Sequence, residues 1–190
     1  MKFRCLMVIV IGGLFFAAAH AQTGFGPYTQ AAQIRHEFEV GGVDGRWNVA
    51  SMYYSAGQVK RAHEVLIGLS GGADDDRNYL KGWLSYVMGA PAEAVKDLGL
   101  CQSISCDRLK LAAFIQLGDI FSAEKLAAEA FAKVKNSKNC LIWLSVVLLN
   151  GSGERFDSIV SKESSLLSSL NLAEQQYYTS IGKLRRTLSN

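Results

Sequence analysis

The residues best suited to covalent chemistry in this sequence are two cysteines, Cys101 and Cys106, with four residues between them. In an oxidising compartment such a pair can form a local disulfide bond. The alternative is that both are small apolar side chains in a core. No histidine or second cysteine pair lies nearby, so the spacing does not favour a metal site. Cys140 is left over and fits a core position.

Three consecutive carboxylates, Asp74, Asp75 and Asp76, form the densest acidic group. Carboxylates at the start of a helix interact favourably with its positive dipole end. The alternative is a calcium loop, but no glutamate or further ligand pattern follows the three aspartates. The sequence therefore predicts that a helix begins here.

Motifs for catalysis are scarce. The sequence contains no phosphate-binding glycine loop, no HExxH and no CxxC. His36 and His63 do not stand at a spacing from cysteine or serine that would argue for nucleophilic catalysis. We therefore expect a protein that is not an enzyme, with no catalytic residue, no cofactor and no metal.

The N-terminal region resembles a secretory signal. A short positive start is followed by an apolar run from Cys5 to Ala19 and by the small-x-small sequence Ala19-His20-Ala21. This pattern predicts a signal peptide over residues 1–21 and a flexible segment over 22–27. The alternative is an uncleaved anchor, although the run is shorter than the roughly 20 residues of a bilayer span. We expect an exported protein, periplasmic or secreted, with no stable membrane span after cleavage.

The charge pattern excludes one class of partner. The chain has a net charge of +3, and without its first 21 residues the net charge is +1. No cluster of lysine and arginine marks a nucleic-acid surface. We expect no nucleic-acid partner.

The elements that must position these residues follow a glycine ladder. Glycines return at intervals of 29 to 33 residues, at Gly26, Gly57, Gly89, Gly118, Gly151 and Gly182. A period of this length is typical of stacked helix pairs. A glycine can end a helix because it tolerates the left-handed conformation of the turn that follows.

The residues around the four middle glycines repeat as well. Small or apolar residues recur five and nine positions after each glycine, and four and seven positions before it. At these offsets they form one apolar stripe on the helix before the glycine and another on the helix after it. The predicted helices are 28–40, 46–56, 59–69, 76–88, 91–101, 107–117, 120–134, 138–149, 154–169 and 172–188. The predicted fold is an all-α solenoid in a single domain, 28–188, with capping helices at both ends.

The spacing of Tyr53, Gly57, Ala62 and Leu66 resembles the tetratricopeptide repeat, and so does that of Gly82, Gly89, Ala94 and Leu98. The resemblance covers residues 43–165. In that family the first helices of the repeats line a concave groove. The resemblance implies that groove residues in this chain are Asp44, Trp47, Tyr54, Tyr79, Trp83, Tyr86, Arg108 and Gln116. Tryptophan and tyrosine recur at binding hot spots. The alternative is that these aromatic side chains pack between helices.

The fourth repeat would present Leu141, Leu148 and Leu149 on the same face, as either a covered surface or a second contact patch. The first functional hypothesis is an adaptor or assembly factor that binds a protein or peptide in the groove. The second is a structural subunit of an envelope complex or homo-oligomer. The third is an accessory module that binds glycans through its aromatic side chains.

Overall fold

The computed structural model describes residues 36–37, 40–69 and 74–187. The predicted signal peptide, the segment 22–27 and most of the predicted helix 28–40 lie outside the described residues. Within the described ranges the protein is all-α and contains no strand, which confirms the predicted class. No helix in these ranges has the length and apolar character needed to cross a bilayer.

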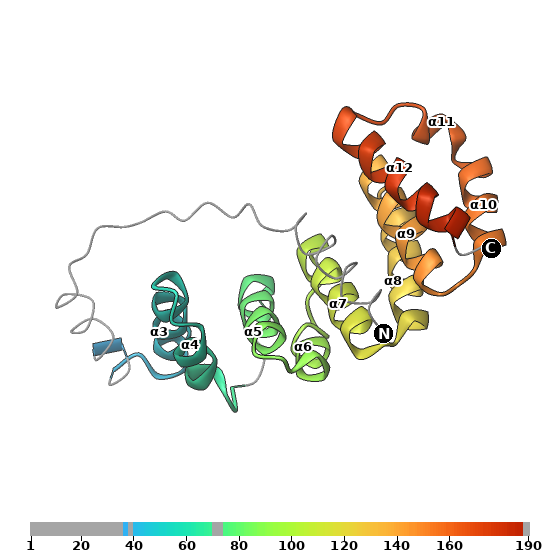
Figure 1. The fold of residues 1–190 in the computed structure, drawn as a ribbon. Helices are drawn as coiled ribbons and strands as arrows, with labels where there is room; N and C mark the ends of the chain where they lie inside the picture. Colours follow the sequence, from blue (N-terminus) through green and yellow to red (C-terminus); the bar gives the residue numbers. More distant parts are fainter. Residues whose placement is uncertain (1–35, 38–39, 70–73, 188–190) are drawn as a thin grey trace. The chain divides into compact units, whose positions relative to one another are not determined.

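The helices follow one another with short connections (Figure 1). Their bounds are α3 Gly42–Ser55, α4 Val59–Leu66, α5 Asp75–Val87, α6 Pro91–Asp97, α7 Ile104–Leu117, α8 Ile120–Lys133, α9 Ser137–Leu149, α10 Gly153–Lys162, α11 Ser164–Leu167 and α12 Leu172–Thr187. The starts of α3 and α7 lie four and three residues earlier than predicted, and those of α5, α9 and α10 lie one residue earlier. The predicted helix 154–169 is interrupted at Glu163, which separates α10 from α11.

The predicted glycine turns are confirmed. Gly57, Gly89, Gly118 and Gly151 have φ angles of 74°, 79°, 78° and 75°. They follow α3, α5, α7 and α9, which are the first helices of the predicted repeats. A side chain in this left-handed region is strained, so these four positions favour glycine.

The repeated apolar positions form the cores. Five residues after the turn glycines, Ala62, Ala94, Ala123 and Phe156 are all buried. Seven residues before three of them, Ala50, Leu111 and Leu144 are buried too. At Gly82, which is the equivalent position before Gly89, an added Cβ would lie 2.4 Å from Cγ of Leu98. The missing side chain therefore lets α5 and α6 approach closely.

The chain divides into two compact units, Met1–Gln116 and Leu117–Asn190, here called unit 1 and unit 2. In unit 1, α3 packs on α4, α5 packs on α6, and α4 contacts α5. One small core lies around Trp47, Ala50, Ala62, Leu66 and Leu84. A second is formed by Leu98, Cys101, Cys106 and Leu109. The sequence prediction of a single domain stays a prediction.

Unit 2 is built around α9, which contacts α8, α10 and α12. Its single core holds ten buried residues: Phe131, Cys140, Leu141, Leu144, Val147, Leu148, Phe156, Ile159, Leu170 and Ile181. Leu141 and Leu148 are therefore covered, as one of the two sequence hypotheses expected. A helix that is apolar on most of its circumference needs neighbours on several sides.

Candidate functional site

Three aromatic side chains lie along one face of α5. Tyr79, Trp83 and Tyr86 are spaced at i, i+4 and i+7, which places them on the same side of a helix. All three are half-buried and pack against the core of Leu98, Cys101, Cys106 and Leu109. The rings of Trp83 and Tyr86 stack with centroids 6.2 Å apart. We call these three residues the aromatic face of α5.

A disulfide bond between Cys101 and Cys106 is part of the core on which this face packs. Their Cα atoms are 6.0 Å apart, and the bond closes a short loop between α6 and α7. Within it, the backbone N–H of Cys106 donates to Oγ of Ser103 at 3.3 Å. Nζ of Lys110 donates to the carbonyl oxygen of Cys101 at 3.1 Å. The loop is thus fixed by a covalent bond and by hydrogen bonds to its backbone.

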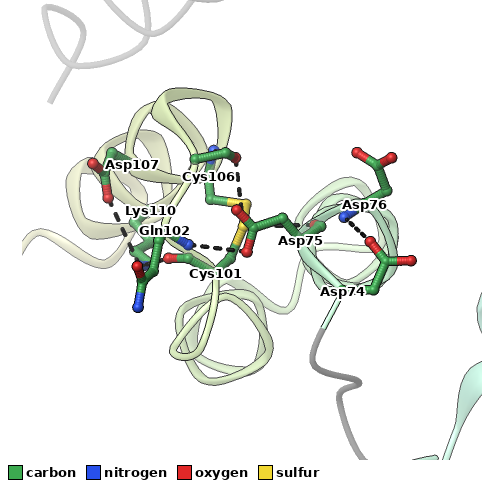
Figure 2. The surroundings of a disulfide bond; sticks show 9 residues. Asp74, Asp75, Asp76, Cys101, Gln102, Cys106, Asp107 and Lys110 are labelled. Carbon is green, nitrogen blue, oxygen red and sulfur yellow. Dashed lines mark hydrogen bonds and ion pairs between the residues drawn. A yellow bond between two sulfur atoms is a disulfide. The ribbon is translucent and has the colours of Figure 1, made fainter.

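The first turn of α5 meets the disulfide loop through Asp75. Figure 2 shows the Asp75 carboxylate beside Gln102, whose backbone N–H donates to Oδ1 at 3.1 Å. The Cys101 sulfur is 3.5 Å from the Asp75 carbonyl oxygen, but as a half-cystine it has no hydrogen to donate. The polar link between α5 and the loop is therefore the bond from Gln102 to Asp75.

The three aspartates act as the predicted helix start. Asp74 is the N-cap of α5, and its Oδ1 accepts the backbone N–H of Asp76 at 2.9 Å. Such a cap satisfies one of the N–H groups that a helix leaves unpaired. No group of histidine, cysteine, aspartate and glutamate side chains suited to a metal ion is found among the described residues.

Tyr79 and Tyr86 keep their hydroxyl protons at neutral pH. Burial raises the pKa of Tyr79, and the neighbouring Tyr54 raises it further. Burial likewise raises the pKa of Tyr86. Tyr54, near the end of α3, is 38% exposed. The neutral hydroxyls can both donate and accept hydrogen bonds, so the rings offer apolar surface with polar edges.

Trp47 belongs to a core. Its side chain is only 3% exposed, and it packs with Ala50, Ala62 and Leu66. The guanidinium of Arg77 lies over its ring, 5.7 Å from the centroid, and pairs with the predicted groove residue Asp44 at 2.7 Å. Of the aromatic residues assigned to the groove, Trp47 thus has the least surface to offer a ligand. For this residue the packing alternative describes the structure.

The α7 candidates differ from each other. Arg108 is half-buried, and its Nε has no hydrogen-bond partner in the structure. Gln116 is exposed near the end of the helix. Arg108 directly precedes Leu109, a member of the core on which the aromatic face of α5 packs.

Sequence reasoning missed a polar network between α5 and α6. Nζ of Lys81 lies 2.8 Å from Oδ1 of Asp97, and Oγ of Ser85 donates to Oδ2 of Asp97 at 2.8 Å. Nζ of Lys81 also donates to the carbonyl oxygen of Leu69 at 2.7 Å. One signal for it was present, since Ser85 stands where the other repeats have a larger apolar residue. The network fixes α5 on its partner helix.

Unit 1 also contains a short sequence with the spacing of a hydrolase motif. Gly68-Leu69-Ser70-Gly71-Gly72 has the G-x-S-x-G spacing of a nucleophile elbow. That elbow lies between a strand and a helix. In this chain the segment connects the helices α4 and α5, and residues 70–73 lie outside the described ranges. The context of the motif therefore differs from that of a hydrolase.

Comparisons of the chain with protein-family models, with curated proteins and with solved structures find no match. The tetratricopeptide resemblance therefore stays a prediction that rests on the repeated residues. Three aromatic residues on α5, with Tyr54 on α3, form the strongest candidate for a binding surface. Side chains of this kind are suited to noncovalent binding of a partner.

Proposed function

We propose that this chain is an exported tetratricopeptide-like repeat protein that binds a protein or peptide partner, as an adaptor or assembly factor. In this proposal the helix pairs stack as a solenoid with capping helices at its ends. The first helices α3, α5 and α7 line its concave groove. The four left-handed turn glycines and the buried residues at repeated offsets support the repeat.

The observation that carries the proposal is the aromatic face of α5. Its rings are half-exposed and are held by packing against the disulfide core. Side chains that are already fixed lose little conformational entropy when a partner binds. Aromatic rings with polar edges also supply much of the binding energy in protein interfaces. Tyr54, which influences the pKa of Tyr79, extends the surface toward α3.

One observation favours the second candidate, a structural subunit of a complex or homo-oligomer. Phe121 and Leu172 in unit 2 are 76% and 73% exposed, and Leu100 in unit 1 is 71% exposed. Single exposed apolar residues are common on monomers. They would become buried if this chain packed permanently against a neighbour or a second copy.

Site-specific photo-crosslinking in the native cell envelope tests the proposal. A photoreactive phenylalanine analogue replaces Tyr54 in one variant and Phe121 in a matched control. We expect a defined protein adduct from position 54 and none of the same mass from position 121. Tyr54→Ala should then weaken binding of the isolated partner by roughly tenfold, while Phe121→Ala leaves it unchanged.

The same experiment separates the alternatives. An adduct between two copies of this chain, formed from position 121, supports the structural subunit. A polysaccharide adduct at position 54 supports the glycan-binding module. Equal adducts from both positions, or none at position 54, would overturn the assignment of the aromatic surface.

A further inference from the structure

The disulfide loop of residues 101–106 connects three helices of unit 1. Cys101 follows the end of α6, and Cys106 lies in the first turn of α7. The loop also reaches α5, because Gln102 donates its backbone N–H to Asp75. A single covalent bond therefore lies where α5, α6 and α7 meet (Figure 2).

The two sulfur-bearing side chains are a large part of the core that they occupy. Cys101 is 3% exposed and Cys106 is fully buried, and the other buried members are Leu98 and Leu109. The aromatic face of α5 packs on this core. So small an apolar cluster contributes little burial energy of its own, and covalent links usually supplement such cores.

We propose that oxidation of Cys101 and Cys106 is the step that completes the fold of unit 1, so that the aromatic face of α5 forms only in an oxidising compartment. The two thiols lose two protons and two electrons as their sulfur atoms bond. Glutathione disulfide, or the disulfide of a thiol oxidoreductase, accepts them, and its own S–S bond is cleaved to two thiols. This inference concerns regulation by compartment and does not depend on which partner binds.

Unit 2 supplies the internal comparison. Its one cysteine among the described residues, Cys140, is reduced and buried in a core of ten residues. Burial keeps this thiol away from the exchange reaction while unit 2 is folded. Unit 2 should therefore fold equally well with or without an oxidant.

The test follows the two units separately in the full chain by tryptophan fluorescence. A Trp143→Phe variant leaves Trp47 and Trp83, which report unit 1. A Trp47→Phe/Trp83→Phe variant leaves Trp143, which reports unit 2. Each protein is unfolded thermally in its oxidised form and after reduction by dithiothreitol, with alkylation and mass spectrometry to verify the state of Cys101 and Cys106. We expect the unit 1 transition to lose amplitude on reduction, because α5 is then already unfolded, and the unit 2 midpoint to stay in place.

A second measurement uses the chain without any tryptophan substitution. The denatured, reduced chain is refolded in glutathione disulfide or in reduced glutathione, and hydrogen exchange of α5 is compared with that of α9. We expect α5 to regain protection only with the oxidant, and α9 to regain it in both. Equal protection of α5 in the two conditions, or equal loss in both units on reduction, would overturn the proposal.

A matched pair of substitutions isolates the link from the loop to α5. Asp75→Ala removes the acceptor of the Gln102 N–H, whereas Asp76→Ala removes an adjacent, exposed carboxylate from the same helix turn. We expect Asp75→Ala to make α5 exchange several-fold faster than Asp76→Ala does in the oxidised protein. After reduction the difference should disappear, because the loop is no longer held. A difference that persists in the reduced protein would contradict a role for the disulfide in holding α5.

Discussion

Unit 1 and unit 2 are all-α regions of one chain, yet they bury their apolar side chains in different ways. Unit 1 divides its buried residues between two small cores, one of which contains a disulfide. Unit 2 has one continuous core around α9. Repeated helix pairs with similar turn glycines can thus be stabilised with a covalent link in one region and without one in another.

The polar contacts of unit 1 also differ from those of unit 2. In unit 1 they join individual helices, as the Lys81–Asp97 ion pair does for α5 and α6 and the Arg77–Asp44 ion pair does for α3 and α5. In unit 2 they join segments around the common core. Arg155 and Asn150 both contact the buried Glu124 of α8, and Arg185 of α12 pairs with Asp157 of α10. We therefore expect a core substitution in unit 1 to destabilise mainly the helices around it. A core substitution in unit 2 should destabilise every helix of that unit.

The largest expected effect comes from removing a core leucine in each unit. Leu144→Ala should lower the free energy of unfolding of unit 2 by about 4 kcal/mol, since Leu144 is fully buried in the shared core. Leu66→Ala should cost about 3 kcal/mol, because the smaller core of α3 and α4 can relax around the cavity. Hydrogen exchange measures both: protection should fall in every helix of unit 2 for the first variant, and mainly in α3 and α4 for the second. Uniform loss across unit 1 in the second variant would refute the idea of separate cores.

A smaller effect is expected from the buried thiol of unit 2. Burial, with a further contribution from Glu163, raises the pKa of Cys140 from 9.0 to about 11. Between these values the unfolded chain releases the proton while the folded unit retains it, so stability falls as pH rises. The loss due to this thiol should be about 2 kcal/mol across the window, and it is absent below pH 9.

Chemical denaturation at pH 8 and pH 11 measures this effect through Trp143 fluorescence. Cys140→Ala should make unit 2 less sensitive to pH in this range, even if it lowers stability at both values. Tyr177 has a raised pKa in both proteins, and its titration cancels in the comparison. Tyr178 is a second reporter, because Cys140 is one of the groups that raise its pKa and that part of the shift is lost in Cys140→Ala. An identical pH dependence in the two proteins would contradict the assigned cause.

The smallest expected changes in the free energy of unfolding come from two glycines that lie within helices. Gly82→Ala should destabilise unit 1 by about 1.5 kcal/mol, because the new Cβ would lie 2.4 Å from Cγ of Leu98. Gly182→Ala, in α12, meets no atom within 4 Å and should stabilise unit 2 by about 0.8 kcal/mol through helix propensity. Urea unfolding of both variants checks the signs. In the Leu98→Ala background the clash is removed, so Gly82→Ala should cost less there than in the natural chain. Equal costs in the two backgrounds would argue against close packing as the cause.

Several features of this protein were determined by the sequence alone. The helix class, most helix ends and the four turn glycines follow from local patterns, because a helix end depends on residues only a few positions apart. The apolar stripes predicted the buried positions from Ala50 to Phe156 for the same reason. The aspartate cap of α5 was also predictable, since a cap forms within one turn.

Only the tertiary structure decided which predicted binding residues remain at the surface. Trp47 and Tyr54 lie on the same helix, yet Trp47 is buried beneath Arg77 while Tyr54 stays partly exposed. The attachment of the disulfide loop to Asp75, and the position of α9 at the centre of unit 2, likewise join residues far apart in sequence. Helix periodicity specifies the direction of a side chain on its own helix. Its burial depends on which other helix packs there, and that is determined by contacts between distant parts of the chain.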